Sequence, residues 1–226
     1  MTEFPRTPRT SIRRLPKRGS YDRDTVYSIL DEGVLCHVGF AERDQPFVIP
    51  MAYARRGDEI LLHGSIGSRL LRAVAAGTEI AIAVTHLDGI VVARSAFHSS
   101  MNYRSVIVFG RGREIEEPEE RKQALDALVE HLIPGRNAEV RPMTDEEMRV
   151  TRVVSVPIGE AVAKIRTGPP IDDEADYQLP IWAGVLPVSM TAGAPLADPR
   201  LGDSGVAVPA SVRTMSTSFR AGGVGD

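Results

Sequence analysis

The sequence contains little of several features that mark particular classes of protein. The single cysteine among 226 residues, Cys36, cannot form an intramolecular disulfide, which excludes a disulfide-stapled secreted scaffold. The formal net charge of −3 is too weak to favour nucleic acid or an anionic membrane as the main partner. The longest apolar runs, such as 80–84, are far shorter than the about 20 residues of a membrane-spanning helix. No apolar stretch follows the basic N-terminal residues, so we expect a cytoplasmic protein without a secretory signal.

Composition and length describe an ordinary globular protein with extensions at both ends. Hydrophobic residues make up 42% and charged residues 25% of the chain. Residues 1–18 carry six basic side chains against one acid, which favours a solvated arm or an arm that folds over an anionic ligand or a neighbouring subunit. Residues 19–188 are the expected domain. Residues 189–226, rich in Gly, Ala, Ser and Pro, are expected to form an irregular tail.

The central region is predicted to be mainly β with peripheral helices (α+β). In the predicted strand 34–40, Cys36 and Val38 share an inward face, whereas Leu35 and His37 lie on the other. Few helices are available for parallel crossovers, so we expect a closed or partly closed antiparallel barrel. The further predicted strands span 47–54, 59–63, 79–86, 90–96, 103–115 and 153–165, with a tight turn at 87–89. Helices are predicted after Asp22, over 70–76 and 119–132, and after a capping box at Thr144.

The segment 64–69 combines features that suit a phosphate. Its two glycines allow backbone amides to approach a ligand closely, and Ser65 and Ser68 add hydroxyl groups. Arg69 offers a planar guanidinium at the start of the predicted helix. The segment therefore predicts a phosphate cradle. The alternative is a structural glycine loop in which a serine caps the helix and Arg69 lies on the surface.

A second candidate is the strand that begins at Tyr103. Arg104 shares one strand face with the apolar residues Val106 and Val108, so its charge requires an anion or an internal salt bridge, for example to Asp88 or Glu59.

The remaining chemically active residues give weaker signals. No histidines, cysteines and carboxylates are spaced as a metal site, so no metal is expected. His63 ends a strand beside the predicted cradle and is either a ligand neighbour or a half-buried, hydrogen-bonded histidine. Cys36 is expected to be a core thiol. Trp182, the only tryptophan, either packs the C-terminal segment or stacks on a ligand.

Five segments form an ordered set: 13–18 (RRLPKR), 48–53 (VIPMAY), 62–69 (LHGSIGSR), 98–110 (HSSMNYRSVIVFG) and 182–187 (WAGVLP). Together they resemble the FMN-binding split-barrel proteins, the pyridoxamine 5'-phosphate oxidase-like superfamily. The likeness is greatest to the flavin-nucleotide-binding and nitroimidazole-resistance-type branch. It implies a six-stranded antiparallel Greek-key split barrel that forms a homodimer, with FMN in a cleft between subunits.

The resemblance also implies site residues. Ser68 and Arg69 match the pair that holds the flavin phosphate, with Ser65 and His63 beside them. The strand whose backbone runs along the isoalloxazine ring is matched by Pro50, Met51, Ala52 and Tyr53. Those that match the strand reaching the flavin from the other subunit are Tyr103, Arg104 and Ser105, and Trp182 is a further cofactor candidate.

Two departures bear on the reaction. Leu70 stands where the classical oxidase has lysine, and no counterpart of its C-terminal Arg-x-His element is present, so oxidation of pyridoxamine phosphate is not expected. We expect an FMN-dependent oxidoreductase for an unidentified small molecule, with His63 as the candidate for proton delivery. The alternatives are a non-catalytic flavin-binding or storage module, a haem-handling barrel with His37 or His63 on the iron, and a regulator that binds nucleic acid through the basic arm.

Overall fold

The computed structural model describes residues 2–202 and 204–221, with side chains described as far as residue 215. The chain forms two compact units. Unit 1 holds the residues up to 86 together with 103–132 and 142–167. Unit 2 holds 87–102, 133–141 and the residues from 168 onward. Within the described residues, no helix has the length and apolar character needed to span a membrane.

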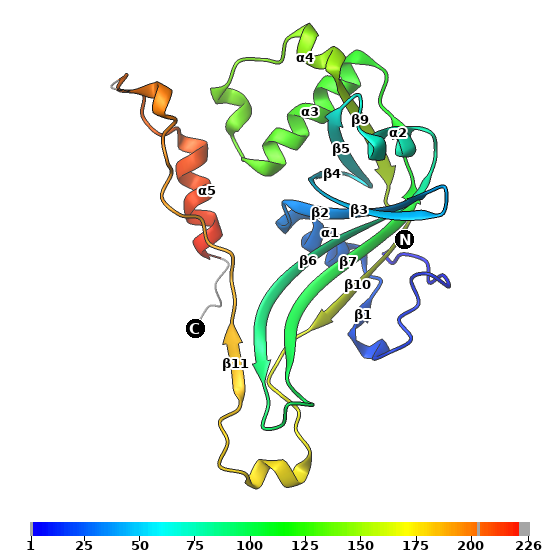
Figure 1. Ribbon diagram of the computed structural model, residues 1–226, viewed down its shortest axis with the longest axis vertical. Coiled ribbons are helices and arrows are strands. Elements are labelled where there is room, and N and C mark those ends of the chain that lie inside the picture. Colours follow the sequence, from blue (N-terminus) through cyan, green and yellow to red (C-terminus); the bar gives the residue numbers. More distant parts are fainter. Residues whose placement is uncertain (1, 203, 222–226) are drawn as a thin grey trace. The chain divides into compact units, whose positions relative to one another are not determined.

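The larger antiparallel sheet brings together strands from both ends of the chain. Two of them, β6 and β7, run side by side as long curved strands, and the shorter β10 pairs with β7 (Figure 1). Alternation along β2 matches the expected faces, because Cys36 and Val38 are buried and Leu35 and His37 are exposed. In sheet order, the strands are β1 (Gly19–Ser20), β10 (Glu160–Arg166), β7 (Ser100–Arg111), β6 (Glu79–Val92), β2 (Leu35–Glu42) and β3 (Gln45–Ala52).

A smaller antiparallel sheet of unit 1 completes the barrel. Its order is β4 (Ala54–Arg56), β5 (Glu59–Ser65), β9 (Thr151–Pro157) and β8 (Arg113–Glu114). The two sheets are joined where β3 leads into β4 and where β9 leads into β10. The sequence predicted one strand over 153–165, whereas the structure divides it at Ile158 and Gly159, where the chain passes from one sheet to the other.

Two apolar clusters cover the two faces of the smaller sheet. The inner cluster lies between the sheets and includes Ile60, Leu62 and Val154. The outer cluster includes Leu61 and Val153 and is covered by α3 (Pro118–Leu132), which lies against this sheet in Figure 1. Neighbouring residues of β5 therefore belong to different clusters, as the period of two of a strand requires.

The other helices of unit 1 begin where the sequence predicts. Asp22 caps α1 (Arg23–Glu32) by accepting from the amide of Thr25 at 2.8 Å. Ser68 caps α2 (Arg69–Ala75), and Gly77 follows this helix with φ +77°. Thr144 and Glu147 form the expected capping box of α4 (Asp145–Val150). A short 3-10 helix, η1 (Pro16–Arg18), precedes β1.

Side chains from three elements satisfy the carbonyl groups at the end of α1. The Tyr53 hydroxyl donates to the oxygen of Leu30, which lies in the last turn. The Nε2 atom of His86 lies 3.0 Å from the oxygen of Ile29, and the Nε2 atom of His131 lies 2.6 Å from that of Gly33. The last four carbonyl groups of a helix have no backbone partner within it, so these contacts tie α1 to the barrel.

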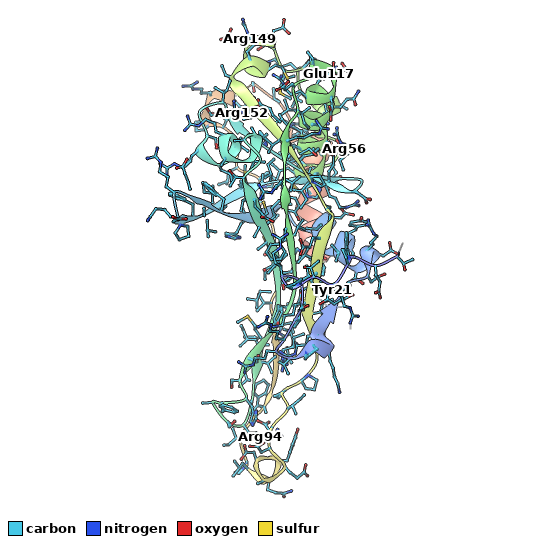
Figure 2. All side chains as sticks on the ribbon, turned by 90° about the vertical axis from the view of Figure 1, so that its right-hand side faces the viewer. Tyr21, Arg56, Arg94, Glu117, Arg149 and Arg152 are labelled. Carbon is cyan, nitrogen blue, oxygen red and sulfur yellow. The ribbon has the colours of Figure 1, made fainter. Side chains whose placement is uncertain are left out.

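The N-terminal segment is packed rather than solvated. Phe4 is buried at 2% exposure, and the Tyr21 hydroxyl donates to the carbonyl of Thr10 at 2.8 Å (Tyr21 is labelled in Figure 2). Arg9 forms ion pairs with Glu79 and Glu160. The solvated alternative therefore fails for this part of the arm, because apolar burial and ion pairs attach it to unit 1.

In unit 2, a buried ion pair fixes the segment that follows the barrel. Asp172 has a fully buried side chain and accepts from the backbone amide and from the guanidinium of Arg94, both at 3.0 Å (Arg94 is labelled in Figure 2). Arg94 also stacks on Tyr177. The regular elements of this unit are η2 (Arg136–Glu139), η3 (Glu174–Gln178), β11 (Gly184–Pro187), η4 (Pro199–Leu201) and α5 (Ala210–Ala221).

One expectation for this region, the turn at 87–89, is wrong, and the mostly irregular tail contains one helix. The chain does not turn at 87–89, because β6 continues to Val92 and pairs with β11. A Cβ at Gly89 would lie 3.1 Å from the oxygen of Leu186, so glycine at this position reflects close strand approach rather than a turn. The tail is not wholly irregular, because it contains α5, and Ser211 at its start donates from its amide to Glu139 at 3.1 Å.

Candidate functional site

The segment 64–69 is a short connection held at its centre. β5 ends at Ser65 and α2 begins at Arg69. The amide of Ile66 donates to the carbonyl of Val150 at 3.0 Å, and the guanidinium of Arg152 donates to the carbonyl of Ile66 at 3.1 Å (Arg152 is labelled in Figure 2). The sequence analysis missed these anchors because they lie more than 80 residues away.

Both serine hydroxyls of this segment retain a hydrogen for a ligand. Ser65 Oγ accepts from the amide of Gly67 at 3.3 Å, and Ser68 Oγ accepts from the amide of Leu71 at 3.4 Å. A hydroxyl that accepts from the backbone still has its own O–H to donate. Ser68 therefore serves as the helix cap that the structural alternative requires, and it also offers the donor that a phosphate cradle requires.

Arg69 is positioned by the hairpin between β2 and β3. Its guanidinium stacks on the ring of Phe47, 4.8 Å from the centroid, and its Nε lies 3.7 Å from a carboxylate oxygen of Glu42. The Arg69 side chain remains 52% exposed. A long, solvent-exposed ion pair contributes little energy, so the guanidinium is available to an anion. No sequence pattern pointed to Phe47 or Glu42, because only strand pairing brings them beside the cradle.

The four residues of the predicted flavin strand differ in their surroundings. Pro50 is exposed, Ala52 is half-buried, and Met51 packs against the inner cluster while its carbonyl accepts from the thiol of Cys36 at 3.4 Å. Tyr53 is 1% exposed, and burial raises the pKa of its hydroxyl. The Tyr53 side chain therefore packs in the core and its hydroxyl holds α1, which leaves only the backbone of this residue to run along a ligand.

Arg104 has an internal partner. Its guanidinium makes a two-bond ion pair with Glu32, with one N–O distance of 2.8 Å, and this contact lowers the pKa of the Glu32 carboxyl. The salt-bridge alternative is confirmed, although the partner is neither Asp88 nor Glu59. Tyr103 and Ser105 lie on the opposite strand face, where Ser105 Oγ donates to the carbonyl of Lys164 at 3.2 Å.

His63 lies on the α3 side of the smaller sheet. It pairs with Val153, a member of the outer cluster, and its Nδ1 is enclosed without a hydrogen-bond partner in the described structure. Burial lowers the pKa of its imidazole, which keeps the ring neutral at pH 7. A neutral imidazole is a poor acid, so this environment argues against proton delivery by His63 at neutral pH.

The other candidates are placed as follows. Cys36 is buried, and burial raises the pKa of its thiol to about 12, which confirms it as a core residue. Trp182 lies in unit 2 with 69% of its surface exposed, so it does not pack there as a core side chain. Among the residues that the structure describes, no group of histidine, cysteine and carboxylate side chains is arranged to hold a metal ion.

The sequence and fold can now be compared with known proteins. The family model described as pyridoxamine 5'-phosphate oxidase matches residues 22–165, which is more than half of the chain. The chain belongs to the pyridoxamine 5'-phosphate oxidase family. The expected antiparallel split barrel of this family is confirmed, with short additional strands beyond the expected six. No curated protein matches the chain.

Two solved structures of the same barrel are similar over nearly their whole length. The flavocytochrome Anf3 from Azotobacter vinelandii is 40% identical, with 92% of this chain and 97% of that chain covered and a TM-score of 0.86. The FAD and haem binding protein from Mycobacterium smegmatis is 40% identical, with 88% and 97% covered and a TM-score of 0.84. A 5-nitroimidazole antibiotic resistance protein described as putative, from Bacteroides thetaiotaomicron, shares the fold at 22% identity, with 65% and 86% covered and a TM-score of 0.56.

Proposed function

We propose that this chain is a redox protein that binds a flavin nucleotide and haem. The observation that carries the flavin part is the anchored segment 64–69, which carries two serine hydroxyls that can still donate and a half-exposed guanidinium. These groups fit a phosphate, which accepts hydrogen bonds and binds arginine in a bidentate manner. Support for a flavin comes from the family, and from two similar proteins named as a flavocytochrome and as an FAD and haem binding protein.

The chain's own residues have separate tasks in this proposal. Ser65, Ser68 and Arg69 hold the phosphate, and the stack on Phe47 keeps the guanidinium beside the loop. β3 is the edge strand of the larger sheet, and the backbone at its end, at Met51 and Ala52, is the part that the family resemblance places along the flavin ring. A bound flavin would supply the ability to accept and pass on electrons, singly or in pairs.

In this proposal the flavin is FMN, as the family resemblance implies, and the alternative is FAD, for which one similar protein is named. The half-exposed Arg69 leaves the phosphate end of the site open, which allows a longer nucleotide to extend from it. The electron acceptor in this proposal is an unidentified small molecule in the cytoplasm.

A homodimer is part of the proposal. Unit 2 exposes several large apolar side chains, among them Phe97 at 89%, Ile171 at 73% and Trp182 at 69%. Apolar surface of this kind marks contact sites, and a second copy of the chain is the partner that the family resemblance implies. Gel filtration with light scattering tests the assembly independently of any cofactor.

The flavin test is a titration of purified protein with FAD and with FMN, followed by flavin fluorescence. Arg69→Ala removes a charged hydrogen-bond donor worth about 1.5–3 kcal/mol, so flavin affinity is expected to fall by about 10- to 150-fold. Arg72→Ala is the matched control, because Arg72 is an exposed cation of the same helix. Equal affinity of both variants, or no binding by the unaltered chain, refutes the cradle.

A further inference from the structure

The histidines of this chain are not equally available to an iron atom. There are five, and two of them hold the end of α1 through their Nε2 atoms. His98 Nε2 lies 3.4 Å from the carboxylate of Asp173. His63 faces the outer apolar cluster, where α3 covers the sheet. Only His37 combines an exposed side chain with a position on an uncovered strand face in the described structure.

The surroundings of His37 form a flat apolar floor. In strand register, His37 pairs with Pro50 of β3 on one side and with Ala83 of β6 on the other. The next pair along β2 is Gly39, which is flanked by Val48 and Ala81. Directly paired residues of an antiparallel sheet share a face, so these side chains surround the imidazole.

Size and exposure set this floor apart from an ordinary solvated sheet face. Apart from His37, the paired positions hold glycine, alanine, proline and valine, and none is charged. Val48 is 67% exposed, and Leu35, two residues before His37 on the same face, is 51% exposed. Exposed apolar side chains around one polar group indicate a surface that is covered by an apolar ligand when the protein works.

From this arrangement we infer that His37 would bind the iron of a haem held against the outer face of β2, β3 and β6. This rests on the proposed haem function and assigns it a place. Haem is planar and apolar on both faces, and imidazole is a common ligand of its iron. Small residues beside His37 leave room for the macrocycle, whereas Val48 and Leu35 supply apolar contact at its margins.

The test is reconstitution of the purified full chain with hemin, read by the Soret band that remains after gel filtration. His37→Ala is expected to weaken haem retention by about tenfold or more, equivalent to about 1.4 kcal/mol, and added imidazole is expected to restore the band. His98→Ala is the matched control, since it also removes one histidine side chain. Flavin affinity, measured on the same samples, is expected to stay unchanged in both variants.

A second variant tests the floor without altering the imidazole. Val48→Glu places a carboxylate at a position that is already 67% exposed, so the fold tolerates it, while a charge opposes the apolar macrocycle. It is expected to weaken haem retention with circular dichroism unchanged. If His37→Ala and Val48→Glu both retain as much haem as the unaltered chain, the chain binds haem elsewhere and the site at His37 is refuted.

Two other outcomes separate the site from the function. If the unaltered chain binds flavin but retains no haem, the haem part of the proposed function fails, and the assignment of His37 fails with it. If, in addition, Val48→Glu converts a dimer to a monomer, the face is a contact between two copies of the chain, which also overturns the haem site.

Discussion

Substitution of Tyr53 tests whether its side chain binds a ligand or stabilises the fold. The family resemblance assigns it to the flavin strand, whereas the structure buries it at 1% exposure with its hydroxyl donating to the carbonyl of Leu30. That carbonyl lies in the last turn of α1, where no helical amide can reach it. Tyr53→Phe keeps the ring in the core but removes the donor, and it leaves a buried oxygen unpaired.

The expected cost follows from this single change. Loss of one buried hydrogen bond with an unsatisfied acceptor costs about 1–2 kcal/mol. For a chain of this length, each kcal/mol lowers Tm by about 2–4 °C, so Tyr53→Phe is expected to lower Tm by about 2–8 °C. Flavin affinity is expected to remain unchanged, because the side chain faces away from solvent.

The assay measures stability and binding on the same preparation. Far-UV circular dichroism follows unfolding of the barrel, since the single tryptophan, Trp182, is 69% exposed in unit 2 and reports poorly on unit 1. Flavin fluorescence gives the dissociation constant. An unchanged Tm together with flavin affinity weakened about tenfold would refute the structural assignment of Tyr53 and favour the ligand role.

Three further predictions concern stability. Burial lowers the pKa of His63, so its neutral form stabilises the fold fully above the unfolded pKa of about 6.5. Tm is expected to fall as the pH drops below that value, and thermal unfolding of His63→Gln is expected to show a weaker fall over the same acidic range. Asp172→Asn removes the buried carboxylate that pairs with Arg94, at a cost of about 3–5 kcal/mol, so limited proteolysis is expected to cut the segment 168–183 faster. Asp173→Asn is the control, because its side chain is 80% exposed, and its rate of cleavage is expected to stay unchanged. Equal rates of cleavage in the two variants would contradict this prediction. Gly112→Ala places a Cβ 2.5 Å from Val74 Cγ1 and 2.8 Å from the oxygen of Ser155, so the free energy of unfolding, measured with denaturant, is expected to fall by about 1–3 kcal/mol. Gly159→Ala is the control, because its Cβ would have no atom within 4 Å, and its free energy of unfolding is expected to match that of the unaltered chain.

Local patterns determined much of the fold and part of the candidate site. Alternation placed Cys36 and Val38 inside β2 and His37 outside, because adjacent strand residues point to opposite faces. Capping chemistry located the starts of α1 and α4 at Asp22 and Thr144, whereas it left Ser65 and Ser68 both open as the cap of α2. Glycine and hydroxyl content also located the segment 64–69, since it needs no distant residue to be recognised.

The tertiary structure decided what depends on distant partners. Arg104 looked uncompensated in sequence because Glu32 is 72 residues away, and only the fold brings the two together. Gly89 resembled a turn residue until β11, almost 100 residues later, was found against it. Tyr53 and His63 alternate with apolar residues as any strand residue does, so their roles depend on which helix covers each face. Sequence by itself determined most of the elements, the family resemblance and the position of the candidate segment 64–69, because these rest on local chemistry. Only the assembled sheets show which charges pair, which residues contact Arg69 and which side chains surround His37. Strand pairing joins residues that no local pattern in the sequence connects.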